Sequence, residues 1–169
     1  MAEQLTTPRE LLAACLRQML WIERRLADDL LPRLSEQAHA PGLRAGFDRH
    51  LLETEAHVDT VRDVLDDLRV PAEPEESPAF RGLVEEHAQL VGRVSEDDHL
   101  LTDLAHAVAV LATEHLELAT YESLVSLAES LGEEEVGIRL RGVLEQEEFA
   151  LEQVEGAMAK LLAEKVESV

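Results

Sequence analysis

The stretch LRGVLEQEEFALEQVEGAMAKL, residues 140–161, predicts the fold of this chain. Apolar residues recur in it at alternating steps of four and three, as they do along a helix that packs lengthwise into a bundle. The one interruption is Glu147, a carboxylate in an otherwise apolar seam. The seam consists of Leu140, Leu144, Glu147, Leu151, Val154, Met158 and Leu161.

A second seam near the N-terminus repeats this arrangement, with Glu23 as its single carboxylate. An ionised carboxylate in a protein core costs several kcal/mol even after its surroundings relax, whereas a whole domain is stable by only about 5–15 kcal/mol. Two such residues therefore indicate a compensating cation; the alternative is a core glutamate that is protonated or bridged by water. The second seam consists of Leu12, Leu16, Met19, Glu23, Leu26 and Leu30.

The charge balance limits the partners. The chain has 36 Asp and Glu against 15 Lys and Arg, a formal net charge of −21. Such a field repels nucleic acid and anionic membranes and attracts cations, so we expect metal ions as partners, no nucleic acid and no membrane. The apolar runs are shorter than the roughly 20 residues of a membrane span, and the N-terminus lacks signal-peptide features. A single cysteine, Cys15, excludes an internal disulfide, so we expect a cytoplasmic protein.

Helix boundaries follow from caps and breaks. Thr7-Pro8 predicts the first helix start, Pro41-Gly42 and the loop VPAEPEES (70–77) are breaks, and Gly132 predicts a helix end. Aromatic residues are few, and Ala, Leu and Glu are abundant. We expect an all-α single domain over 1–169, an antiparallel bundle of four long helices with an extra short helix between the second and third. The expected helices are 8–37, 43–69, 78–94, 98–131 and 133–166.

Each long helix carries acids or histidines near its midpoint. Bundles build carboxylate-bridged two-metal sites from a Glu on each of two helices plus Glu/His pairs on the others. Carboxylate and imidazole ligands suit iron, manganese or zinc. His50 and His115 are expected to support ligands. Tyr121 is expected to pack in the core; the alternatives are that it bonds to a ligand carboxylate or passes an electron. The expected metal ligands are Glu23, Glu53, His57, Glu114, Glu117 and Glu147.

At these residues the chain resembles the bacterial YciE/YciF-type stress proteins of the ferritin-like superfamily. The resemblance implies a ferritin-like bundle, a homodimer, a dinuclear metal centre and a link to stress, without a settled activity. It places Glu23, Glu53, Glu114 and Glu147 on the family's acidic positions and Glu117 on its second glutamate of the third long helix. The stretches that carry it are IERRL (22–26), HLLETEAHV (50–58), RGLVEEHAQLV (81–91), EHLELATYESLVSLAESLG (114–132) and VLEQEE (143–148).

Two departures from the family pattern concern the last helix. It contains no histidine, and Leu151 stands where family members often have an aspartate. This side of the site is therefore expected to lack one ligand, which leaves a mononuclear site or an asymmetric pair completed by His115 or Glu148.

Three functions remain open. The first is a di-iron or manganese oxidoreductase that reacts with peroxide or O₂ during stress. The second is metal sequestration without turnover. The third is a metal-free interaction protein whose buried polar groups fix the helix register; several carboxylates at one level would then repel one another or take up protons. A hemerythrin-like site would need about five converging histidines, and the seven present do not align in that way.

Overall fold

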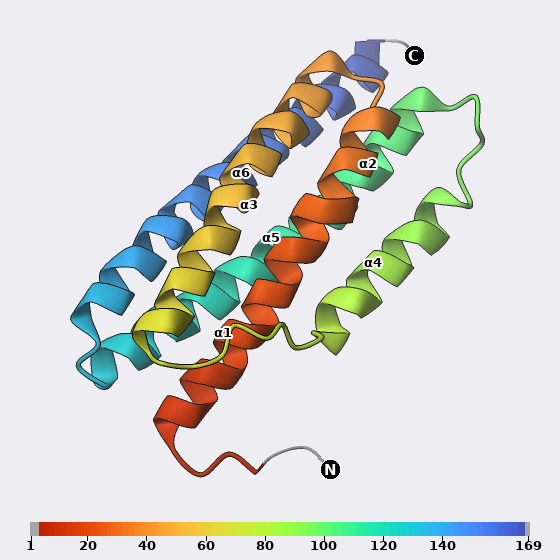
Figure 1. The fold of residues 1–169 in the computed structure, drawn as a ribbon. Helices are drawn as coiled ribbons and strands as arrows, with labels where there is room; N and C mark the ends of the chain where they lie inside the picture. Colours follow the sequence, from red (N-terminus) through yellow and green to blue (C-terminus); the bar gives the residue numbers. More distant parts are fainter. Residues whose placement is uncertain (1–3, 168–169) are drawn as a thin grey trace.

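Helices account for most of the computed structural model, which describes the backbone of residues 4–167 and the side chains as far as residue 163. No strand occurs within that range, so the all-α prediction is confirmed (Figure 1). Each helical segment begins and ends within three residues of its expected range. The elements are α1 (Pro8–Arg25), η1 (Leu26–Leu30), α2 (Leu31–Gln37), α3 (Pro41–Asp67), α4 (Pro78–Val91), α5 (His99–Ser130) and α6 (Glu134–Glu167).

The first long helix is continuous from α1 through η1 to α2. Thr7 accepts a hydrogen bond from the backbone N–H of Glu10, whose carboxylate bonds back to the cap, so the predicted capping box is present. The middle segment, η1, is a π-helical turn in which the N–H of Leu31 bonds to the carbonyl of Leu26. Such a turn holds one more residue than an α-helical turn. The apolar periodicity had not predicted it.

Four long helices form the bundle. The combined α1–α2 helix packs on α3 and α5, and α6 packs on the same two helices, so α3 and α5 lie on a diagonal. In Figure 1 the chain runs upward in α1 and α6 and downward in α3 and α5, so each long helix is antiparallel to both of its neighbours. The antiparallel four-helix bundle is therefore confirmed.

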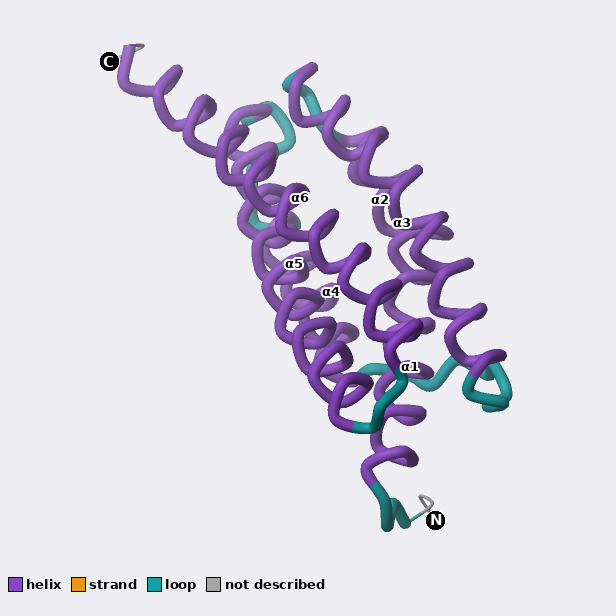
Figure 2. Tube along the Cα trace, turned by 90° about the vertical axis from the view of Figure 1, so that its left-hand side faces the viewer, coloured by secondary structure: helices purple, strands orange, loops and turns teal. Residues whose placement is uncertain are grey.

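The short helix α4 carries the chain from the lower end of α3 to the upper end of α5, outside the bundle (Figures 1 and 2). It packs on α5, and its Phe80 is fully buried, with the ring edge-on to Trp21 at 6.1 Å between centroids. The expected extra helix is present, and it allows α5 to run parallel to α3.

The core is a continuous apolar interior along all four long helices. At the end of α5, Gly132 has a φ of 74°, the left-handed conformation that terminates a helix and favours glycine. In the described part of the chain, no helix combines the length and apolar character needed to cross a membrane.

Candidate metal centre

Buried carboxylates and imidazoles meet in the middle of the bundle. Each side chain projects from the face by which its helix packs on the others, and no residue of the set is more than 6% exposed. The set comprises Glu23 on α1, His50 and His57 on α3, Glu114 and Glu117 on α5, and Glu147 on α6.

The set divides into two groups that share one residue, Glu147. In each group, one potential ligand atom per residue lies within 4.8 Å of the corresponding atoms of the others. Because Glu147 belongs to both groups, its two oxygens can serve two neighbouring cations. The first group is Glu23, His57 and Glu147, and the second is His50, Glu114, Glu117 and Glu147.

His57 is oriented from both sides of its ring. Nε2 lies 2.7 Å from the side-chain oxygen of Gln146 and, as an N–H, donates to it. Nδ1 lies 2.9 Å from Glu147 Oε1 and 3.6 Å from Glu23 Oε2. A proton fixed on Nε2 leaves Nδ1 as the nitrogen that faces the carboxylates, which is how outer partners orient metal-binding histidines.

His50 faces the other oxygen of the shared glutamate. Its Nε2 lies 3.2 Å from Glu114 Oε1 and 3.8 Å from Glu147 Oε2. On the opposite side of the ring, Nδ1 lies 3.5 Å from Glu53 Oε2. Neither ring nitrogen has a partner in hydrogen-bonding geometry among the described residues.

Many of the buried polar atoms of the cluster lack hydrogen bonds. Within residues 4–163, both carboxylate oxygens of Glu117 and of Glu147 lack a hydrogen-bond partner, as does one oxygen of Glu23 and of Glu114. An unsatisfied buried polar group costs about 1–3 kcal/mol, and more if it is charged. Oxygen and imidazole donors without other partners fit a divalent cation, because coordination would satisfy them together.

Without a cation, the cluster holds protons. Burial, together with the charges of Glu147, Glu23 and Glu114, raises the pKa of Glu117 well above its usual value. Burial also raises the pKa of Glu23, against the opposing effect of His57. Burial alone would lower the pKa of His57, but the contacts with Glu147 and Glu23 outweigh it and raise this pKa to about 10. A metal ion would therefore displace protons as it bound.

Tyr121 bonds to a predicted ligand. Its hydroxyl is fully buried and donates a hydrogen bond to Glu23 Oε1. Burial and the nearby charges of Glu23 and Glu147 raise the pKa of Tyr121 well above its usual value. Tyr121 therefore both packs in the core and bonds to the carboxylate of Glu23, a predicted ligand.

The structure brings together five of the six predicted ligands, all except Glu53. The Glu53 side chain is 25% exposed and lies at the edge, where contact with His50 lowers the pKa of Glu53. His115 and Glu148, the residues expected to complete an asymmetric pair, are both exposed and lie outside the two groups. His50 takes that place instead. It lies on the line from Phe47 to His57 at steps of three and four, and the sequence analysis had expected it only to support a ligand.

Comparisons with known proteins agree with this architecture. A family model described as a domain of unknown function, DUF892, matches residues 7–167. Protein YciF of Escherichia coli strain K12 is 27% identical over 118 residues, which cover 69% of this chain and 70% of that protein.

Two solved structures are similar over nearly their whole length. The crystal structure of the E. coli stress protein YciF has a TM-score of 0.87 at 23% identity, and the match covers 94% of this chain and 99% of that one. YcfI from Rhodopseudomonas palustris has a TM-score of 0.86 at 28% identity, covering 92% and 97%. The fold is therefore shared with proteins whose sequences have diverged widely from this one.

Proposed function

This chain belongs to the DUF892 family of YciF-type proteins, and from that premise we propose that its buried cluster holds two divalent metal ions, iron or manganese. The proposal follows chiefly from one observation: both oxygens of Glu117 and of Glu147 are buried in the middle of the bundle without hydrogen-bond partners. Such atoms are costly unless a cation satisfies them.

The two groups assign the ligands. Glu147 would be shared, with His57 and Glu23 on one side and His50, Glu114 and Glu117 on the other. The four buried carboxylates carry the charge that two divalent cations would neutralise. Glu53 remains a predicted ligand, and its Oε2 lies 3.5 Å from His50 Nδ1.

A pair of iron or manganese ions bound there would supply redox chemistry toward peroxide or O₂, and we propose this reaction as the stress-related activity. The residues of the chain prepare the site in three ways. Burial of the cluster excludes bulk water. Gln146 fixes the tautomer of His57, and the Tyr121 hydroxyl holds one oxygen of Glu23.

Elemental analysis of the purified protein beside two alanine variants tests the metal assignment. We expect about two equivalents of iron or manganese in the wild type, as in bundles with carboxylate-bridged pairs. Glu147→Ala should lose them, because both groups need this residue. Glu148→Ala is the matched control, since the neighbouring side chain is exposed and should load normally. Absence of metal after anaerobic reconstitution with ferrous iron would refute the proposal and favour the metal-free interaction protein.

Turnover distinguishes an oxidoreductase from a sequestering protein. Both have the same ligands, but only the oxidoreductase consumes peroxide in multiple turnovers. Without an added reductant, repeated turnover means disproportionation of two peroxide molecules to O₂ and two water molecules. We expect metal-loaded wild-type protein to remove many equivalents of peroxide in this way, and metal-loaded Glu148→Ala to do the same. Consumption that stops at one equivalent per metal pair would assign the protein to metal sequestration.

A further inference from the structure

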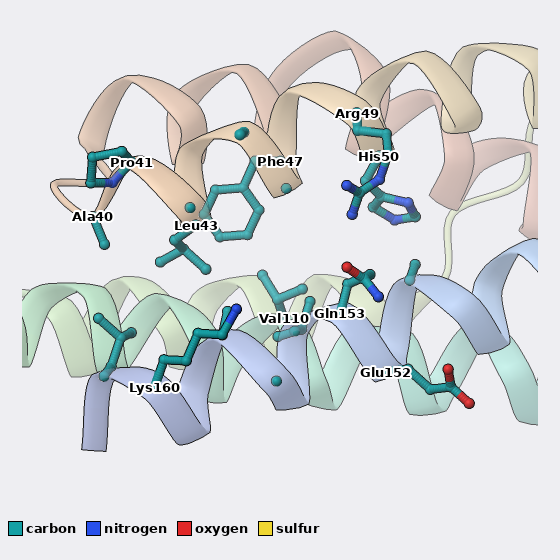
Figure 3. Close-up of a pocket in the computed structure, with 18 residues that line it drawn as sticks. Ala40, Pro41, Leu43, Phe47, Arg49, His50, Val110, Glu152, Gln153 and Lys160 are labelled. Atoms are coloured by element: carbon teal, nitrogen blue, oxygen red, sulfur yellow. The ribbon is translucent and has the colours of Figure 1, made fainter. Parts of the chain in front are cut away.

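A cavity of about 400 Å³ adjoins the candidate metal centre. It lies between the first half of α3 and the second half of α6, and Val110 of α5 forms part of its floor (Figure 3). The deeper walls are apolar, with Leu43, Phe47 and Leu161 at most 5% exposed. Its volume is within the range of small-molecule sites, roughly 300–1,000 Å³.

The space results from small residues on the facing helices. Gly46 lies at helical spacing between Leu43 and His50, and a Cβ added to it would meet no atom within 4 Å. On α6, Ala150 and Ala157 line the opposite wall. The opening is therefore built by two helix faces and does not depend on the rotamer of one side chain.

The inner end of the cavity is closed by His50. This side chain is 6% exposed, lines the cavity, and has no hydrogen-bond partner at either ring nitrogen among the described residues. Behind its ring lie the carboxylates of Glu114, at 3.2 Å, and Glu147, at 3.8 Å. Arg49 also lines the cavity beside His50 (Figure 3), but its guanidinium lies 4.0 Å from Glu53 Oε1 and 5.7 Å from the centre of the Phe149 ring. Since this cation is already engaged and two carboxylates lie close to the imidazole, this end of the cavity favours an apolar group over an anionic one.

The outer end carries a cation. Figure 3 shows the amine of Lys160 reaching toward the space between α6 and α3, while the carboxylate of Glu152 points away from it. At 1.5 Å per residue, the ten residues from Ala150 to Lys160 span about 15 Å along α6. The cavity is thus elongated, with an apolar body, Lys160 toward the outer end, and His50 with Arg49 at the inner end.

We propose that this cavity binds a linear apolar carboxylate of about eight to ten carbons, a length that fits a helix segment of about 15 Å. The carboxylate lies at Lys160 and the apolar end lies against His50. The proposal rests on the proposed metal centre in one respect, that the bound chain would end beside a metal ligand. Binding itself is measured separately from metal loading.

Calorimetric titration of the full chain with sodium decanoate tests the cavity. We expect saturable binding of one decanoate per chain in the wild type and at least about tenfold weaker binding in Gly46→Leu, whose side chain would fill the cavity. Gly142→Leu is the matched control, because Gly142 is also helical, has equally open space around it and does not line the cavity. It should bind like the wild type. Absence of binding to the wild type, or unchanged binding in Gly46→Leu, would overturn the proposal.

Titration with decanol tests the carboxylate. Lys160→Gln should weaken decanoate binding by about threefold to fivefold, the range of an exposed ion pair, and leave decanol binding unchanged. Equal loss for both molecules, or no loss for decanoate, would overturn the assignment of the carboxylate to Lys160.

Two further readouts separate this proposal from its alternatives. Metal content measured on the same Gly46→Leu sample should equal that of the wild type, so failure of the cavity and failure of the metal centre are distinguishable. Light scattering gives the oligomeric state. If Gly46→Leu dissociates a dimer and the wild type binds no decanoate, the cavity is covered by a second copy and the proposal is overturned.

Discussion

Replacing Glu117 by glutamine should stabilise the metal-free protein while weakening its metal binding. Glu117 is fully buried and neither of its oxygens has a hydrogen-bond partner among the described residues. Burial and three neighbouring carboxylates raise its pKa well above the usual value, and no cationic group opposes them. A neutral amide of the same shape removes the like charge and can donate hydrogen bonds to the remaining carboxylates.

An upper limit on the magnitude follows from the raised pKa of Glu117, because folding then favours uptake of a proton. In the unfolded chain, a glutamate with a pKa of 4.5 is ionised at pH 7. Protonating it in the unfolded chain costs about 1.4 kcal/mol for each pH unit above this pKa, or about 3 kcal/mol at pH 7. Because the folded-state pKa is the higher one, this cost is absent below about pH 4.5 and grows as the pH rises. Glutamine avoids it, so we expect a gain of at most about 3 kcal/mol at pH 7, which corresponds to at most about 6–12 °C in Tm.

Urea unfolding in the presence of a chelator, followed by far-UV circular dichroism at pH 5.5 and 7, measures the effect. The advantage of Glu117→Gln over the wild type should fall to about 1 kcal/mol at pH 5.5. Glu122→Gln is the control, since Glu122 is exposed on the same helix and should change little at either pH. A Glu117→Gln variant that is no more stable than the wild type at pH 7, or whose advantage does not change with pH, would refute the reasoning.

Three further predictions concern neighbouring groups. Gln146→Leu should lower metal affinity by about 10–100-fold in a chelator competition, because it removes the acceptor that fixes the His57 ring. Tyr121→Phe should reduce the metal-free unfolding free energy by about 1–3 kcal/mol in urea, because it leaves a buried carboxylate oxygen unsatisfied. Burial and the charge of His106 lower the pKa of His87 to about 4. The unfolded chain therefore takes up a proton on His87 below about pH 6.5, whereas the folded chain does so only near pH 4. The free energy of unfolding is thus fully retained above pH 6.5 and falls as the pH falls toward 4. Since His87 is only partly buried, we expect an acid loss of about 1 kcal/mol that His87→Leu abolishes, measured as the difference in urea unfolding between pH 7 and pH 5.5.

The helix ends could be predicted because their causes are local. The capping box at Thr7, the proline after Ser77 and the glycine at position 132 each act within one turn of the chain. The π-helical turn η1 has no such local cause, since residues 26–30 have an ordinary helical composition. Its geometry depends on how the two halves of the first long helix pack against the rest of the bundle, which the sequence pattern does not contain.

On α1, α5 and α6 the ligands expected from the sequence lie in the buried cluster. On α3 His57 lies in the cluster as well, but Glu53 lies at its edge. Glu23 and Glu147 interrupt clean apolar seams, so their burial was evident. On α3 the sequence analysis expected Glu53 as a ligand and His50 only as a supporting residue, whereas Glu53 lies at the edge of the cluster and His50 within it. The line that is buried contains polar residues and reads Phe47, His50, Thr54, His57, Val61 and Val64. Because three of its six members are polar, apolar periodicity alone did not mark this line as buried, and His50 was therefore expected to support a ligand.

The π-helical turn η1 is equivalent to the insertion of one residue into an α-helix. Up to Leu26 the buried line follows α-helical steps, whereas beyond η1 it continues at Leu31, Leu34 and Ala38, each one residue later than an unbroken helix would place it. Deleting the exposed Asp28 would bring these three residues onto the α-helical positions. Loss of one residue inside a long helix rotates everything after it by about 100°, yet at this point it should restore the register. The first long helix is thus expected to tolerate the deletion of Asp28. The metal content and the thermal unfolding temperature of the deletion variant should equal those of the wild type.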